Sequence, residues 1–383
     1  PGGALAISDG RIAWVGTLTD LPGKPTGLAR RVVAGNDRLM TPGLLDCHTH
    51  LVFGGDRSLD FDLRTQGIDY ATIAARGGGI RSTVRHTRAL AAADLAAIAL
   101  PRARALVREG ATTLEIKSGY GLSTASELAM LEAAHQIGAM LNITVMPTLL
   151  ALHALPQDAK GREHYIDEVI QELLPEVARR KLATAVDVFC ETIAFSHAEC
   201  ARVLAAACDL GLAVKVHADQ LSDQDGAALA AEYGALSADH VEYTSERGVA
   251  ALAPAGTVAV LLPGAFLMLA ETRKPPVAAL REAGVAIAVA TDLNPGTSPC
   301  TSLPLSMTLA RAQFGLTAAE GFLGVTRHAA TALGLSHRKG QLTVGYDADI
   351  ALWNLAHPRE LGYWLGGGHC HGVLHAGQEP RLG

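Results

Sequence analysis

In residues 43–50 the sequence reads Gly-Leu-Leu-Asp-Cys-His-Thr-His, an apolar run that ends in two histidines one residue apart. A short apolar run of this kind predicts a buried β-strand. Because successive side chains of a strand point to opposite faces, His48 and His50 should lie on the same side. The stretch therefore predicts a strand that carries two potential metal ligands at its carboxyl end.

Seven further apolar stretches follow along the chain, separated by helical stretches rich in Ala and Leu, such as 125–139, 165–180 and 197–210. The predicted strands are 43–50, 112–117, 143–150, 185–191, 213–219, 236–241, 258–262 and 285–292. Strands that alternate with helices indicate a parallel sheet, and eight such units can close a (β/α)₈ TIM barrel. A doubly wound open sheet is the alternative, but no Gly-rich phosphate loop follows the first strand. We therefore expect an α/β barrel.

The two ends of the chain predict a smaller β unit. Residues 4–16 hold two apolar runs around Asp9-Gly10, which is a hairpin signal, and residues 340–353 carry a similar pattern. We expect a small β-sandwich formed from residues 1–41 and 336–383, with the barrel at 42–335. The chain begins inside the first run and without Met, so we also expect the natural N-terminus to lie upstream.

Composition narrows the class of partner. The 383 residues are 49% hydrophobic and 18% charged, with a formal net charge of −6, which argues against a nucleic-acid partner. No apolar run reaches the roughly 20 residues of a membrane span, and no signal peptide opens the chain. Six scattered cysteines are typical of reduced thiols in a cytoplasmic protein. We expect a small-molecule partner, and a homodimer is one assembly compatible with these features.

Polar residues occupy the carboxyl ends of the predicted strands. They are His48, His50, Lys117, Glu191, His217, His240 and Asp292. In a (β/α)₈ barrel these ends converge on one face, where active sites form. The sequence therefore predicts one polar site to which several strands contribute.

The residue types at this site indicate a metal ion. His217 and His240 each end an apolar strand, and Asp292 follows another. A buried carboxylate should be paired, hydrogen-bonded or bound to metal, because burial of an unpaired charge is costly. Histidines with one carboxylate suit Zn²⁺, with Fe²⁺ or Fe³⁺ as competitors. A second His-Cys-His, at 369–371, lies outside the barrel strands, and we expect it in the terminal β unit.

Together, these motifs resemble the amidohydrolase superfamily. The resemblance covers essentially the whole chain and is carried by residues 42–50, 50–57, 74–80, 115–121, 152–156, 217–222 and 291–297. Within the superfamily, these phrases are most similar to those of members that act in histidine degradation. The resemblance implies hydrolysis of a ring C–N bond in 4-imidazolone-5-propanoate, which gives N-formimidoyl-L-glutamate.

The resemblance also implies residue roles. One metal ion per subunit, zinc or iron, would be held by His48, His50, His217 and Asp292. Asp292 would also move the proton during catalysis, and His240 would lie beside the reacting carbonyl. Contacts with the substrate would come from Arg57, Tyr70, Tyr120, His153, Asn294, Gly296 and Thr297.

Two positions depart from patterns in the superfamily. Gln220 stands where some relatives carry Glu; it can orient the ring or a water molecule but cannot accept a proton. Lys117 invites comparison with the carbamylated lysine of binuclear relatives. The resemblance points instead to a mononuclear site, so we expect an ion-paired lysine.

Other functions stay open on the residues alone. Another cyclic amidohydrolase, or a cytosine- or guanine-type deaminase, would use the same metal ligands. A deaminase would have no use for Arg57, Tyr120 and His153 around a carboxylate. A non-catalytic barrel that binds a metal or ligand is the alternative of a different class.

Overall fold

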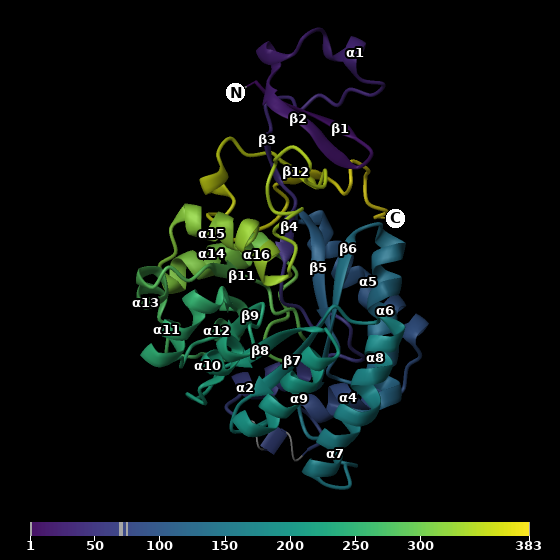
Figure 1. Cartoon of the computed structure of the whole chain (residues 1–383), viewed down its shortest axis with the longest axis vertical. Helices are drawn as coiled ribbons and strands as arrows, with labels where there is room; N and C mark the ends of the chain where they lie inside the picture. Colours follow the sequence, from purple (N-terminus) through teal and green to yellow (C-terminus); the bar gives the residue numbers. More distant parts are fainter. Residues whose placement is uncertain (1, 69–71, 74–75, 383) are drawn as a thin grey trace.

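The computed structural model describes residues 2–68, 72–73 and 76–382, and an eight-stranded parallel barrel forms its centre (Figure 1). The barrel strands are β4 (Leu44–Asp46), β5 (Ala111–Lys117), β6 (Thr144–Leu152), β7 (Ala185–Cys190), β8 (Ala213–Ala218), β9 (Ser237–His240), β10 (Val258–Leu261) and β11 (Ile287–Val289). Each pairs with its neighbours in chain order. All eight predicted strands are confirmed, and so is the barrel class.

The first and last strands close the barrel through the residues that follow them. The backbone N–H of His50 donates to the carbonyl of Leu293 at 2.9 Å, and that of Asp292 donates to the carbonyl of His48 at 3.0 Å. A parallel bridge joins Thr49 and Leu293 between these bonds. This seam brings the His-Thr-His stretch beside Asp292, although 242 positions separate His50 from Asp292 in the sequence.

 Strand pairing at the seam, not proximity in the chain, therefore assembles this part of the site.

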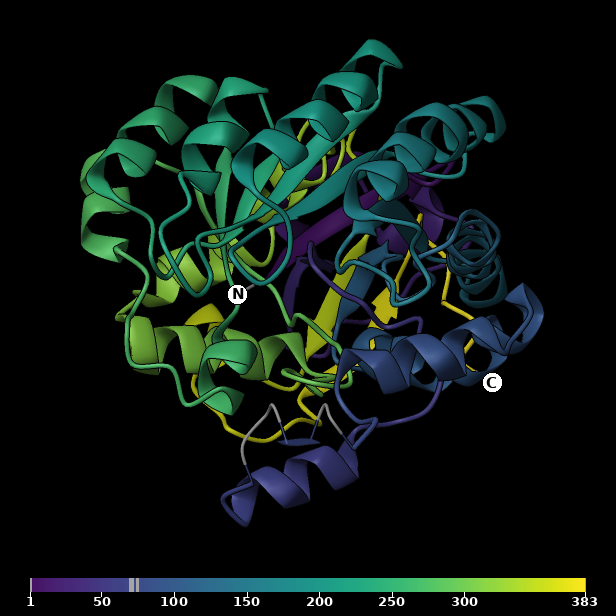
Figure 2. The same ribbon diagram turned by 90° about the horizontal axis from the view of Figure 1, so that it is seen from below.

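Helices surround the barrel, as the view along it shows (Figure 2). Those that follow the successive strands are α2 (Ser58–Thr65), α4 (Ile80–Arg88), α5 (Ala92–Arg108), α6 (Thr124–Leu141), α7 (Arg162–Glu168), α8 (Leu174–Arg180), α9 (His197–Asp209), α10 (Gly226–Glu232), α11 (Glu246–Ala255), α12 (Pro263–Met268), α13 (Val277–Glu282), α14 (Leu303–Phe314), α15 (Ala318–Gly324) and α16 (Arg327–Ala332). A short π-helical segment at Val169–Leu173 joins α7 to α8. Among the described residues, no helix combines the length and apolar character needed to cross a membrane.

Both ends of the chain form additional sheets, as expected. β1 (Gly3–Ser8) and β2 (Arg11–Thr17) make the predicted hairpin, and β3 (Leu39–Pro42) pairs with β12 (Ile350–Trp353), which pairs with β13 (Cys370–Leu374). The hairpin is tied to the C-terminal segment, since the N–H of Ile12 donates to the carbonyl of Tyr346 at 2.9 Å. In Figure 1 these sheets lie at the opposite end of the barrel from α2. The domain boundaries at 41/42 and 335/336 stay predictions.

Trp353 joins the terminal sheet to the barrel. Its side chain is 1% exposed, and its indole N–H donates to Oγ1 of Thr41 at 2.8 Å. The ring packs directly on Gly110, which has a φ of +101° just before β5, so a Cβ at that position would overlap the indole. Glycine is therefore required at residue 110 both by its backbone conformation and by the close approach of Trp353.

We expect Gly110→Ala to lower the free energy of unfolding by about 2–5 kcal/mol, from left-handed strain together with overpacking against Trp353. The matched control is Gly211→Ala, which has a φ of +73° and no atom within 4 Å of the added Cβ. That control should cost only about 1–2 kcal/mol. Equal losses for the two variants in denaturant unfolding would contradict the packing role of Trp353.

Candidate metal centre

Three imidazoles converge at the carboxyl ends of the barrel strands. Nε2 of His50 lies 3.1 Å from Nε2 of His48 and 3.3 Å from Nε2 of His217. Oδ1 of Asp292 lies 3.5 Å from Nε2 of both His48 and His50. The structure thus brings together the four residues that the sequence predicted as metal ligands.

The spacing of these donor atoms fits a metal ion. Ligands at 2.0–2.1 Å from a tetrahedral Zn²⁺ lie roughly 3.3–3.4 Å apart. Four of the six donor separations, at 3.1–3.5 Å, bracket that value, and the four side chains are at most 4% exposed. Buried lone pairs this close repel one another unless a proton or cation lies between them, so the arrangement favours a cation.

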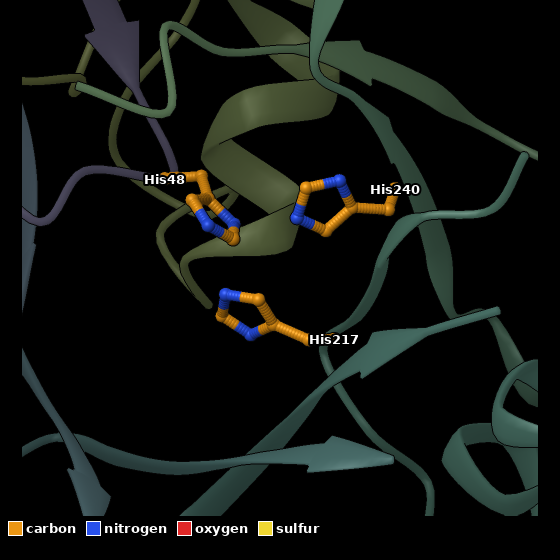
Figure 3. A group of neighbouring side chains, drawn as sticks. All are labelled: His48, His217 and His240. Atoms are coloured by element: carbon orange, nitrogen blue, oxygen red, sulfur yellow. The ribbon is translucent and has the colours of Figure 1, made fainter. Parts of the chain in front are cut away.

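His240 ends β9 beside this cluster. Its ring centre lies 5.4 Å from that of His217 and 5.8 Å from that of His48, and the three rings point toward one another (Figure 3). The backbone of His240 has a φ of 81° and that of Asp292 a φ of 52°. A non-glycine residue at positive φ costs about 1–3 kcal/mol and is typical of functional sites. The turn at each strand end is therefore held in a strained conformation at the cluster.

Two carboxylates in the barrel interior orient the ligand rings. Oδ2 of Asp239 lies 2.6 Å from Nδ1 of His48, and Oδ2 of Asp187 lies 2.9 Å from Nδ1 of His217. A carboxylate at Nδ1 holds the proton on that nitrogen and leaves the Nε2 lone pair free to bind a metal. Asp239 thus selects the tautomer of His48 that a metal site requires, and Asp187 lies at ion-pair distance from Nδ1 of His217.

Two lysines hold these carboxylates in turn. Nζ of Lys117 lies 2.7 Å from Asp187 and 3.0 Å from Glu115, and Nζ of Lys215 lies 2.9 Å from Glu115. All five side chains are at most 1% exposed. Lys117 therefore has the ion-paired role expected from the sequence. Counted as ionised, three carboxylates and two ammonium groups leave one excess negative charge beneath the histidines, which favours a cation there.

Burial sets the protonation of the cluster. It lowers the pKa of His48 and His50 well below the usual range, helped by Lys117 and by neighbouring imidazoles, so both rings are neutral near pH 7. Burial also raises the pKa of Asp292 well above its usual range. Burial opposes the charge on Lys117, but Asp187, Glu115 and Asp239 outweigh it and raise the pKa of that ammonium group. Neutral imidazoles are the form that binds metal.

Residues predicted to contact the substrate fall into two groups. In the first, the guanidinium of Arg57 lies against Gly296, where an added Cβ would be 2.7 Å from Nη1, and Nε donates to Asp60 at 2.5 Å. The side-chain oxygen of Asn294 accepts from the N–H groups of Gly296 and Thr297 at 2.8 and 2.7 Å. Its amide donates to the carbonyl of Asp292 at 2.7 Å. Asn294 therefore shapes the loop that carries Asp292.

The second group of predicted contacts packs around His50, away from Asp292. The ring of His153 stacks on His50 with centres 5.3 Å apart, and Tyr120 lies 5.2 Å from His153. Nδ1 of His153 donates to the carbonyl of Gly119 at 2.9 Å, and burial lowers its pKa to about 4. His153 is therefore a neutral ring whose Nε2 accepts hydrogen bonds. The contact of His153 with the substrate stays a prediction.

Gln220 is half-buried on the loop after β8. Glu191 holds this loop by accepting from the N–H groups of Leu221 and Ser222 at 2.9 and 3.0 Å. Asp219 holds it by accepting from the N–H of Gly226 at 2.8 Å. Glu191 is thus a loop-holding residue. Tyr70, the remaining predicted contact, lies outside the described residues.

Comparison with known proteins agrees with this geometry. Residues 39–376 match the model of the Amidohydrolase family. An imidazolonepropionase of Paracoccus denitrificans (strain Pd 1222) is 53% identical over 377 residues, which cover 98% of this chain and 94% of that protein. An imidazolonepropionase of Ralstonia nicotianae is also 53% identical, over 99% of this chain and 93% of its own.

The chain belongs to the imidazolonepropionase group of the amidohydrolase family.

Solved structures agree in fold. An adenosine deaminase from Xanthomonas campestris with bound zinc has a TM-score of 0.70 and 22% identity, over 99% of this chain and 88% of that one. A 5-methylcytosine deaminase from Klebsiella pneumoniae has a TM-score of 0.73 and 15% identity, over 98% and 93% of the two chains. At such identities the likeness concerns the fold alone.

Sequence reasoning missed the buried charged residues behind the ligands. They are Glu115, Asp187, Lys215, Asp239 and Glu242. A signal was present, because Asp187 and Lys215 each interrupt an otherwise apolar strand, and a charge buried there needs a partner. His135 and His328 bond to backbone carbonyls. His371 lies in β13, in the terminal β unit, as expected.

We expect Asp239→Asn to weaken metal binding about 10- to 100-fold, because the amide no longer fixes the tautomer of His48 as the carboxylate does. Competition with a chromogenic chelator measures the affinity. Asp209→Asn, at the exposed end of α9, is the matched control and should bind metal like the parent protein. Unchanged affinity in Asp239→Asn would contradict the orienting role.

Proposed function

We propose that this chain is an imidazolonepropionase, which hydrolyses a ring C–N bond of 4-imidazolone-5-propanoate to give N-formimidoyl-L-glutamate in histidine degradation. One observation carries the proposal: three Nε2 atoms and Oδ1 of Asp292 converge within a chain 53% identical to curated imidazolonepropionases. The enzyme is thus a hydrolase of cyclic amide C–N bonds.

We further propose that one Zn²⁺ or iron ion is held by His48, His50, His217 and Asp292. Imidazole and carboxylate ligands accept either metal. When bound, such an ion supplies water acidified to a pKa of about 7 and Lewis acidity toward the carbonyl oxygen.

The protein's own groups would then move the proton. Asp292 accepts it as the water oxygen bonds to the ring carbonyl carbon, and the carbonyl electron pair moves onto its oxygen. His240 donates a hydrogen bond to that oxygen while charge accumulates. As the electron pair returns, the C–N bond breaks and Asp292 passes its proton to the departing nitrogen. The products are a carboxylic acid and an open formimidoyl group. At neutral pH the acid gives its remaining proton to solvent or to the basic formimidoyl nitrogen and becomes a carboxylate, so atoms and charge balance.

Arg57 supports recognition of the propionate tail. A guanidinium binds a carboxylate through two parallel hydrogen bonds. In Arg57 the Nε–H is already used by Asp60, and Nη1 lies beside Gly296, on the loop that follows Asp292. The positive charge of Arg57 is therefore near Asp292, the proposed proton-transfer group, but Arg57 is not one of the candidate metal ligands.

The direct test is to incubate the metal-loaded protein with 4-imidazolone-5-propanoate and follow the loss of ultraviolet absorbance. We expect turnover, loss of turnover after chelation, and recovery with Zn²⁺ or Fe²⁺. Cytosine and guanine serve as comparison substrates for the deaminase alternative. Absence of ring opening by the loaded protein would overturn the proposal, and deamination of either base would replace it.

Substitution of Arg57 tests tail recognition. We expect Arg57→Ala to raise KM about 10- to 100-fold with a smaller change in kcat, because a charge-assisted hydrogen bond contributes about 1.5–3 kcal/mol. Arg108→Ala, an exposed arginine at the end of α5, is the control and should leave KM unchanged. A parental KM for Arg57→Ala would exclude the anchor role.

A further inference from the structure

Glu242 lies two residues after His240, in the turn that follows β9. Both side chains are 3% exposed, and Oε2 of Glu242 lies 3.9 Å from Nδ1 of His240. Both atoms are buried without a hydrogen-bond partner among the described residues. The proposed metal ligands and proton-transfer group do not account for this carboxyl.

Two buried polar atoms without partners are costly, at about 1–3 kcal/mol each. A hydrogen bond between them would satisfy both, and it requires the separation to shorten by only roughly 1 Å. The two orphan atoms are therefore best explained as partners of each other.

The chemistry proposed for His240 needs such a partner. A neutral imidazole carries one N–H, on either nitrogen. One ring nitrogen of His240 faces the other histidines and the second faces away from them (Figure 3). Because Nδ1 is the atom near Glu242, Nε2 is the nitrogen available to the reacting carbonyl oxygen. It can donate only if its hydrogen stays in place.

We propose that Glu242 is a positioning residue for His240, whose carboxyl shares one proton with Nδ1 and thereby keeps a hydrogen on Nε2. Two arrangements contain the same number of protons: a carboxylic acid that donates to Nδ1, and a carboxylate that accepts from Nδ1–H of an imidazolium. Both leave Nε2–H directed at the oxygen. The inference rests on the proposed function and gives Glu242 a positioning role in that reaction.

The surroundings agree with a pair that shares one proton. Burial raises the pKa of Glu242 well above its usual range and outweighs a backbone hydrogen bond that lowers it; the nearby carboxylates of Asp292 and Glu271 add to the increase. Burial, followed by His217, lowers the pKa of His240 well below its usual range.

Glu242→Met tests the proposal, because Met matches Glu in shape and removes the partner of Nδ1. We expect kcat to fall about 100-fold, as for loss of an oriented oxyanion donor, with KM within about threefold. The thermal midpoint should stay or rise, since an apolar replacement of a buried polar group is tolerated. Glu242→Gln, whose amide can donate to Nδ1, should retain about tenfold more activity than Glu242→Met.

Two controls make the test decisive. Glu246→Gln, at the exposed start of α11, should leave kcat unchanged. In a His240→Asn background, Glu242→Met should cause no further loss, because Glu242 acts only through that ring. Parental kcat in Glu242→Met, or an equal loss in both backgrounds, would overturn the inference alone. An inactive parent protein would instead overturn the proposed function and this inference with it.

Discussion

At the carboxyl ends of β4, β8 and β11, Nε2 of His50 lies 3.1–3.5 Å from Nε2 of His48, Nε2 of His217 and Oδ1 of Asp292. The rest of the structure is arranged around this cluster. Lone pairs at separations of 3.1–3.5 Å in a buried site are unfavourable without a positive charge between them. The barrel maintains the arrangement because hydrogen bonds between His48, His50 and the 292–293 segment close its seam. Closing the fold and assembling the ligand set are therefore the same event.

Beneath the ligands, a layer of buried charges replaces the apolar filling usual in a barrel interior. Asp187 and Asp239 contact the ligand rings, and Lys117 and Lys215 contact the carboxylates from below. Each charge in this layer has a partner, which offsets the cost of its desolvation. The layer fixes the tautomer of His48 and surrounds the histidines with negative charge, which favours a cation among them.

The site is also asymmetric about the ligands. Arg57 and the Asn294 loop lie beside Asp292, whereas Tyr120 and His153 lie beside His50. One side therefore offers a positive charge and the other neutral rings. A small polar ring with one anionic tail matches this division better than a nucleobase does, because a nucleobase carries no carboxylate for the guanidinium.

Much of this was predictable from the sequence because the signals are local. Apolar runs that alternate with helical stretches predicted the eight strands, and Asp9-Gly10 predicted the hairpin. Polar residues at the strand ends predicted the candidate site residues His48, His50, His217, His240 and Asp292. Only the folded chain shows which side chains pair when they are far apart in the sequence. His48 with Asp239, His217 with Asp187 and Lys215 with Glu115 are joined over 191, 30 and 100 positions.

The sequence by itself determined which strand ends carry the candidate ligands, since alternation along a strand fixes the side on which each residue lies. Only the tertiary structure decided the charge and tautomer of those ligands. Burial lowers the pKa of His153 to about 4. In the folded chain Glu242 lies 3.9 Å from His240, and each interior lysine is paired with an acid. These properties depend on desolvation and on distances between strands, and neither quantity is encoded by any single stretch of residues.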